Sequence, residues 1–213
     1  MKIQWLGHSC FLLTAQDETR VLNDPFNPEI GYPAPAVAAD IVTTSHQHDD
    51  HNYTKVVRGK FMVINSAGKH TIKGIEILGV PTFHDEAGGS KRGKNLVFRV
   101  TIDGISVVHC GDLGHPLNAE QAKALGAVDV LLVPVGGFYT IDPAAAQQVM
   151  EQLQPRLTVP MHFKTPVLNF PIQPVEPFLA LVGGGKWAGS MTIEVNRASL
   201  AEDPQVVVLD YPR

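Results

Sequence analysis

The chain has 213 residues and a formal net charge of -4, with an isoelectric point near 6.1. A chain of this length can bury one sizeable core but is short for two, so we expect a single domain over residues 1–213. The small acidic excess provides no attraction for a phosphate backbone, which excludes nucleic-acid binding through bulk positive charge.

Short apolar runs rich in β-branched residues recur along the first half of the chain. They are bounded by Gly, Pro, Asn or Asp, a pattern typical of strands. Asp103 and Gly104 separate two such runs and form the strongest hairpin signal in the sequence. The predicted strands are Ile3–Leu6, Cys10–Thr14, Arg20–Leu22, Ile41–Thr44, Phe61–Ile64, Ile75–Gly79, Leu96–Ile102 and Ile105–His109.

The second half of the chain alternates strands with helices. A capping box of Asn118 and Gln121 predicts a helix over 119–125 that Gly126 ends, and Asp142 before Pro143 predicts a second helix that Pro155 closes. A third, weaker helix is predicted near Val175–Val182. The intervening strands are Val130–Pro134, Leu157–Pro160, Thr192–Val195 and Val206–Leu209. This order indicates an α/β fold of two sheets with helices on their outer faces.

The first apolar segment is interrupted by Gln4, Gly7 and His8 before it reaches the length of a signal-peptide core, and no later stretch is long enough to span a bilayer. We therefore expect a cytoplasmic protein without membrane insertion. Cys10 and Cys110 are the only cysteines and lie in apolar runs. Buried free thiols are the expectation for them, with a disulfide or a reactive thiol as alternatives.

The segment His46–His51, HQHDDH, follows the buried strand that is predicted over Ile41–Thr44. In extended conformation His46 and His48 would point to the same side, while Asp50 and His51 follow where the chain turns into a short helix-like segment over 52–58. One loop can thus supply ligands for two metal sites. A solvated polar loop is the simpler alternative, but adjacent imidazoles and carboxylates at the end of a buried strand are costly to desolvate without a cation.

Three further ligand types follow apolar runs elsewhere in the chain, namely His84, Asp112 and His162. Polar residues at strand ends form the sites of α/β proteins, so together with HQHDDH they predict two coordination shells. Imidazole and carboxylate ligands without thiolate favour zinc, with manganese and iron as alternatives.

The motifs WLGHSCFLL, LNDPF, TTSHQHDDHN, VPTFH, HCGDLG, DVLLVPVGG and PMHF cover nearly the whole chain. In this order they resemble the metallo-β-lactamase superfamily, and most of all its branch of ascorbate-6-phosphate lactonase and zinc-dependent hydrolases; the similarity to N-acylphosphatidylethanolamine phospholipase D is more distant. The resemblance implies a four-layer αββα sandwich with a binuclear metal site on one edge.

The resemblance also implies a role for each ligand. His46, His48 and His84 would hold one metal, Asp50, His51 and His162 the other, and Asp112 would bridge the two. His8 and Asp24 resemble positions that orient the ligands, with a buried turn or capping role as the alternative for each. His109 lies inside a predicted strand and is either a core histidine or a further orienting residue.

Two divalent ions roughly 3.5 to 4 Å apart can lower the pKa of a bridging water to about 7. The resulting hypothesis is a binuclear hydrolase in which this hydroxide attacks an ester, lactone or phosphodiester of a small molecule. Asp50 and Asp112 are the candidate catalytic carboxylates. The candidate substrate contacts are Lys91 and Arg92, in a Gly-rich loop over 86–95 that is either a flap over an anionic substrate or a solvated hairpin, together with Tyr139 and Lys164.

Two other functions stay open on the sequence alone. An oxidoreductase could use iron on the same scaffold, although the di-iron oxygen reductases of the superfamily usually place a glutamate where this chain has His48. A non-catalytic metal-dependent binding protein is less compatible with a full ligand set. The expected partner is a small molecule, with no nucleic acid; the chain has no room for the inserted arm of superfamily nucleases. The sequence leaves a homo-oligomer open.

Overall fold

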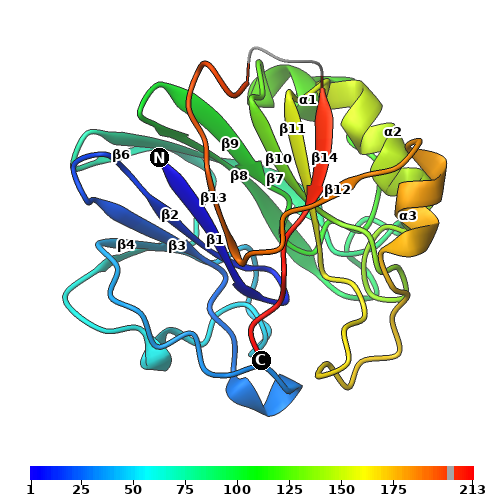
Figure 1. Cartoon of the computed structure of the whole chain (residues 1–213), viewed down its shortest axis with the longest axis horizontal. Coiled ribbons are helices and arrows are strands. Elements are labelled where there is room, and N and C mark those ends of the chain that lie inside the picture. Colours follow the sequence, from blue (N-terminus) through cyan, green and yellow to red (C-terminus); the bar gives the residue numbers. More distant parts are fainter. Residues whose placement is uncertain (201–203) are drawn as a thin grey trace.

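Two mixed β-sheets pack face to face in the computed structural model, which describes residues 1–200 and 204–213 (Figure 1). The six-stranded sheet has the order β13 (Thr192–Glu194), β1 (Lys2–Gly7), β2 (Cys10–Thr14), β3 (Arg20–Asn23), β4 (Ile41–Thr43) and β5 (Met62–Ile64). The eight-stranded sheet has the order β12 (Lys186–Trp187), β14 (Gln205–Val208), β11 (Leu157–Met161), β10 (Val130–Pro134), β9 (Ile105–His109), β8 (Lys94–Ile102), β7 (Ile75–Phe83) and β6 (Gly68–Ile72).

The strands β2, β3 and β4 of the six-stranded sheet are buried on both faces, whereas the edge strands β5 and β13 are partly exposed. Along β2, Phe11 and Leu13 belong to the main core, which also contains Val100 of the other sheet, because alternate side chains point to the same face. Cys10 and Leu12 point the other way into a second core. Both cysteines are buried free thiols, as the sequence predicts.

The outer layers differ between the two sheets. Helices α1 (Ala119–Leu125), α2 (Pro143–Leu153) and α3 (Glu176–Leu181) lie on the outer side of the eight-stranded sheet (Figure 1). The second core packs loop residues such as Phe26 and Tyr32 against the six-stranded sheet. Among residues 1–200 and 204–213, the helical elements on this side are the 3-10 turns η1 (Pro28–Ile30) and η2 (Thr54–Val56). The predicted α/β sandwich is confirmed, and its layer outside the six-stranded sheet consists of loops and 3-10 turns.

Local sequence signals place the helices correctly. Asn118 and Gln121 form the predicted capping box of α1, and Asp142 caps α2 ahead of Pro143. Two strands escaped prediction: β6 is mostly exposed and carries little apolar signal, and β12 has only two residues. Strand β7 continues past its predicted end at Gly79 and includes Pro81. The pairing of β7 with β6 ends at Gly79, so the missing N–H of Pro81 removes no hydrogen bond to β6.

Within the described residues, none of the helices combines the length and the hydropathy needed to cross a bilayer.

Candidate metal centre

The candidate site residues lie in loops at the carboxyl ends of strands from both sheets. Strands β3 and β4 run parallel in one sheet, and β9, β10 and β11 run parallel in the other. Parallel strands end at a common edge, so the loops that follow them converge there. These loops carry Asp24, His46–His51, Asp112 and His162, while His84 follows β7 and His8 lies in the β1–β2 turn.

The first group of imidazoles contains His46, His48 and His84. One ring nitrogen from each lies within 4.8 Å of the other two. Ring centroids are 4.7 Å apart for His46 and His84, and 5.2 Å for His48 and His84. His46 and His84 are buried, whereas His48 is exposed at the rim. This spacing suits one metal ion with three nitrogen ligands.

The backbone that presents these residues differs from the predicted extended strand. Strand β4 ends at Thr43, and residues 45–48 form consecutive bends. The N–H groups of His51 and Asn52 both donate to the carbonyl of His48, at 2.9 and 3.1 Å, and so close a tight turn. The turn, rather than strand alternation, brings both ends of HQHDDH to one place.

The second group of imidazoles contains His8, His51 and His162, again with nitrogens within 4.8 Å of one another. Asp50 lies beside it, with Oδ2 3.3 Å from His8 Nε2 and 3.8 Å from His51 Nε2. The sequence assigns His8 an orienting role, and the structure brings its ring as close to His162 as 4.2 Å between centroids. His8 therefore touches both the imidazoles and the carboxylate of this group.

Asp112 lies between the two groups and shares its carboxylate oxygens between them. Oδ1 is 3.0 Å from His51 Nε2 and 3.4 Å from His162 Nε2. Oδ2 is 3.2 Å from His84 Nε2 and 4.0 Å from His46 Nε2. A carboxylate with one oxygen facing each group is the arrangement that a bridging ligand requires.

Several buried polar atoms at the site have no hydrogen-bond partner among the described residues. Leaving such an atom unpaired costs about 1 to 3 kcal/mol, and a divalent cation would satisfy those that face Asp112. Burial and the neighbouring His51 lower the pKa of His46 to about 3, which keeps its ring in the neutral, metal-binding form. The residues thus fit a metal centre. The unpaired atoms at the centre are Asp112 Oδ1 and the Nε2 atoms of His46, His51 and His162.

The Asp24 carboxylate contacts one imidazole of the second group directly and one of the first group through a serine. Its Oδ2 lies 2.8 Å from His51 Nδ1 and accepts a bond of 2.6 Å from the Ser45 hydroxyl, whose oxygen lies 3.0 Å from His46 Nδ1. Oδ1 accepts the N–H of Ser45 at 2.8 Å. Burial raises the pKa of Asp24, but His51 and His109 outweigh it and the net pKa is lowered. An ionised carboxylate therefore orients one imidazole of each group.

Asn95 and Ser45 are two supporting residues that sequence reasoning missed. The Asn95 side chain donates to Thr82 Oγ1 and to the Cys110 carbonyl, and it accepts the N–H of Asp112 at 3.1 Å. A Cβ at Gly111 would lie 2.5 Å from both Asn95 Oδ1 and Ser45 Cβ, so only glycine fits there. No motif marks Asn95, because it is the last residue of the Gly-rich loop and directly precedes the predicted strand Leu96–Ile102.

His109 ties two turns of the site together. Its Nε2 lies 2.7 Å from the carbonyl of Ser9, and its Nδ1 accepts the N–H of Gly111 at 3.1 Å. These bonds fix the Nε2–H tautomer, since Nδ1 must be the acceptor. His109 is buried and links the turn of His8 to the turn of Asp112, and both predicted interpretations, a core histidine and an orienting residue, stay predictions.

The turn that carries His8 is built around an unusual backbone. His8 has φ of 53°, and its carbonyl accepts bonds from the Trp5 indole at 2.9 Å and from the His162 N–H at 3.2 Å. Burial and the neighbouring His162 lower the pKa of His8 to about 4, so the ring is neutral. The turn therefore holds a neutral imidazole against Asp50 and His162.

The Gly-rich loop after His84 is wound around one carboxylate. Asp85 is buried and accepts four backbone N–H bonds of 2.7 to 3.0 Å, from Ala87, Gly89, Lys91 and Arg92. Burial raises the pKa of Asp85, but these bonds outweigh it and lower the pKa to about 2. The loop is thus wound into a turn around Asp85, and the two predicted alternatives, a flap over an anionic substrate and a solvated hairpin, stay predictions.

A cavity of about 470 Å³ opens onto the first group through His48 and His84, and onto the carboxylates of Asp50 and Asp112. Arg92 and Tyr139, two of the predicted substrate contacts, line it with Phe170. Lys91 does not; it pairs with Glu86 on the exposed side of the loop. The ligands that line the cavity are His48, Asp50, His84 and Asp112.

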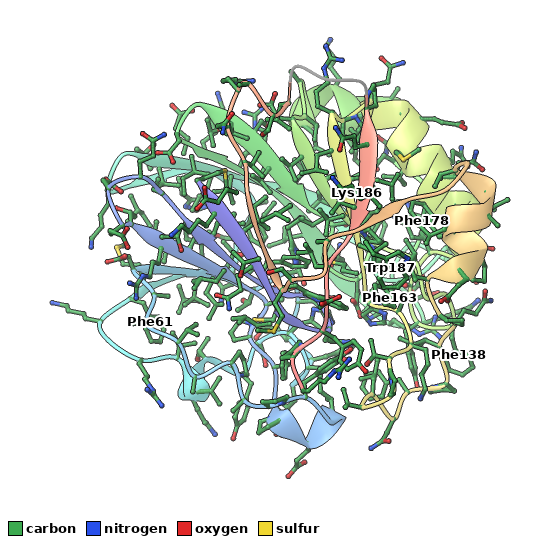
Figure 2. All side chains as sticks on the ribbon, viewed as in Figure 1. Phe61, Phe138, Phe163, Phe178, Lys186 and Trp187 are labelled. Carbon is green, nitrogen blue, oxygen red and sulfur yellow. The ribbon has the colours of Figure 1, made fainter. Side chains whose placement is uncertain are left out.

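Lys164 also lies away from this cavity. Its ammonium donates to the carbonyls of Leu168 and, at 2.9 Å, of Phe170, and so braces the loop that carries the Phe170 ring. Lys164 lines a separate cavity of about 670 Å³ with Phe163 and Trp187, which lie near each other in Figure 2. The predicted substrate contact at Lys164 is replaced by a structural one.

Comparison with known proteins places the chain in a family. The model of the β-lactamase superfamily domain matches residues 2–162. A UPF0173 metal-dependent hydrolase of Thermococcus kodakarensis is 30% identical over 86% of this chain and 92% of its own length. Another, of Methanoculleus marisnigri, is 34% identical over 78% and 82%.

A solved structure agrees with these sequence matches. It comes from Thermotoga maritima, is provisionally described as a zinc-dependent hydrolase of the metallo-β-lactamase superfamily, and is 41% identical with a TM-score of 0.83 over 99% of this chain and 98% of that one. The narrower resemblance to the lactonase branch stays a prediction. The chain belongs to the metallo-β-lactamase superfamily and to the UPF0173 family of metal-dependent hydrolases.

Proposed function

We propose that this protein is a binuclear hydrolase of small molecules, with zinc as its metal. The observation that carries the proposal is the position of Asp112, whose Oδ1 faces His51 and His162 and whose Oδ2 faces His84, in two adjoining groups of imidazoles. His46, His48 and His84 would hold one ion, and Asp50, His51 and His162 the other. Imidazole and carboxylate ligands without thiolate favour zinc, with manganese or iron as substitutes.

The metals, when bound, would supply an activated water and polarise the bond to be cut. Asp50 would act as the proton acceptor of the reaction, a role supported by the 20% exposure of its side chain and by its position in the lining of the cavity. Asp112 is only 2% exposed, so it would fix the positions of the two groups relative to each other rather than exchange protons with solvent. His8 holds the Asp50 carboxylate from the opposite side.

A hydrolysis screen tests the proposed reaction. Metal-free protein reloaded with zinc, manganese or iron would be offered lactones, carboxylic esters, thioesters, phosphodiesters and β-lactams, with oxygen consumption followed in the iron sample. We expect hydrolysis of one ester-like class with zinc or manganese and none by Asp112→Ala protein that keeps its fold. Oxygen consumption without hydrolysis would favour an iron oxidoreductase, and metal binding without either would favour a binding protein.

The cavity supports a small substrate. Its volume of about 470 Å³ is that of a pocket for a drug-sized molecule. The acidic net charge of the chain supports no nucleic-acid partner. Small-nucleotide phosphodiesters stay within the proposed substrate range.

A further inference from the structure

Arg92 is the feature of the cavity that the chemistry of the metal centre does not use. It comes from the loop after His84 and lines both the cavity at the centre and a neighbouring cavity of about 640 Å³. His48, a proposed ligand, lines the same two cavities. The guanidinium therefore stands where the two cavities meet, beside one of the metal groups.

The guanidinium has a support but no counter-ion. Its central carbon lies 5.6 Å from the centroid of the Tyr139 ring, within the range of a cation–π contact. Across residues 1–200 and 204–213, no carboxylate lies within salt-bridge distance of it. The neighbouring Lys91, by contrast, has its charge compensated by Glu86. Arg92 thus keeps its hydrogen-bond donors available on a half-buried surface.

The backbone of Arg92 and the Tyr139 ring beside its guanidinium are each held by neighbouring groups. Its backbone N–H donates to Asp85 Oδ2 at 2.7 Å, inside the turn that Asp85 organises. Tyr139 is held in turn by an edge-to-face contact with Phe170, at 5.7 Å between centroids, and Phe170 packs against His8 at 5.4 Å. A pre-ordered cation costs less entropy to engage than a mobile one.

The other charged residues that line the cavity are carboxylates. Glu29 and Asp49 are exposed, and Asp50 and Asp112 belong to the metal centre, so Arg92 is the positive residue of the lining. An anionic group would be repelled by the exposed carboxylates and attracted to Arg92. The aromatic wall of Tyr139 and Phe170, with Ile30, offers an apolar surface for the rest of a ligand.

We propose that Arg92 is an anion-recognition residue, and that the substrate of this site is a small molecule with a carboxylate or phosphate group apart from the bond that is cut. The guanidinium would bind that group, and the body of the molecule would lie against Tyr139 and Phe170. The statement about a substrate rests on the proposed function, because it assumes a hydrolytic reaction. The binding of an anion by Arg92 does not depend on that reaction.

A matched pair of esters tests the substrate class. Mono-p-nitrophenyl glutarate and p-nitrophenyl butyrate carry the same scissile bond, and only the first has a remote carboxylate. Loss of a hydrogen bond to a charged group typically costs about tenfold or more in binding. We therefore expect Arg92→Gln to raise KM about tenfold for the glutarate ester and to leave KM for the butyrate ester unchanged. Lys91→Gln, the matched control, should change neither.

A binding measurement separates this proposal from the proposed function. Glutarate and methyl phosphate would be titrated into the zinc-loaded full-length protein while the Nε–H signal of isotope-labelled Arg92 is followed by NMR. A shift of that signal and a Kd raised about tenfold in Arg92→Gln support the subsite, with the tighter probe identifying carboxylate or phosphate. An unmoved Arg92 signal with equal Kd in both proteins overturns it. Failure of wild-type protein to hydrolyse either ester counts against the proposed reaction alone.

Discussion

The Nδ1 atom of His51 lies 2.8 Å from Oδ2 of Asp24, and both side chains are fully buried. The same carboxylate reaches His46 through the Ser45 hydroxyl. One residue from the loop after β3 thus sets the ring orientation of two proposed ligands that serve different ions. Partners of this kind typically change metal affinity 10- to 100-fold.

Asp24→Asn should weaken zinc binding by about 10- to 100-fold, because an amide cannot replace a carboxylate toward both His51 and Ser45. A competition titration against a chelator measures this change. Ser45→Ala is the matched control, since it removes only the branch toward His46 and should affect one ion more than the other. Equal zinc affinity in Asp24→Asn and wild type would contradict the orienting role.

His8→Asn should lower the hydrolytic activity and weaken the binding of the zinc ion next to Asp50, while the fold is preserved. Asparagine tolerates the positive φ of this position better than most residues, so the turn can persist. We expect about a tenfold loss of affinity for one of two zinc ions, in the range that loss of a ligand-orienting contact causes. Circular dichroism verifies the fold; unchanged affinity for both ions would show that the contact with Asp50 is incidental.

Gly111→Ala should destabilise the protein far more than Gly74→Ala. Both glycines have positive φ, of 56° and 77°, which costs an alanine roughly 1 to 2 kcal/mol. A Cβ at Gly74 meets nothing within 4 Å, whereas one at Gly111 meets Asn95 and Ser45. Urea unfolding at 25 °C gives the difference. Similar free energies of unfolding for the two variants would mean that the packing around Asp112 is loose.

Asp85→Ala should release the loop over residues 86–93. Four backbone N–H groups would lose their common acceptor, so their amide hydrogens should exchange faster with solvent. Glu86→Ala is the control, because it removes only the exposed pair with Lys91. Slow exchange retained in Asp85→Ala would show that other contacts hold the loop.

Much of the fold could be predicted because its signals are local. Strand β4 is a β-branched apolar run in the sequence, and the residues that cap α1 and α2 lie directly before those helices. Strand β6 could not be found, since its side chains are polar and its pairing with β7 arises from the β6–β7 hairpin rather than from burial. The loop layer over the six-stranded sheet also escaped, because Phe26 and Tyr32 pack there without any periodic pattern.

The ligand types were visible in the sequence because imidazoles and carboxylates gather in HQHDDH and follow strands elsewhere. The residues that contact and orient these ligands were not visible in the sequence. Asn95 meets Asp112 only through the pairing of β8 with β9, and the bond between Asp24 and His51 spans 27 positions. Lys91 and Arg92 are neighbours of like charge, and only the turn around Asp85 sends one outward and the other into the cavity.

Metal stoichiometry tests the central claim most directly. Elemental analysis of zinc-loaded protein should give two ions per chain, with one in His48→Ala, one in His162→Asn and none held tightly in the double variant. His48 is exposed, and asparagine suits the φ of 50° at position 162, so both variants should fold. A single ion in wild type, or loss of the same ion in both single variants, would contradict a centre divided by Asp112.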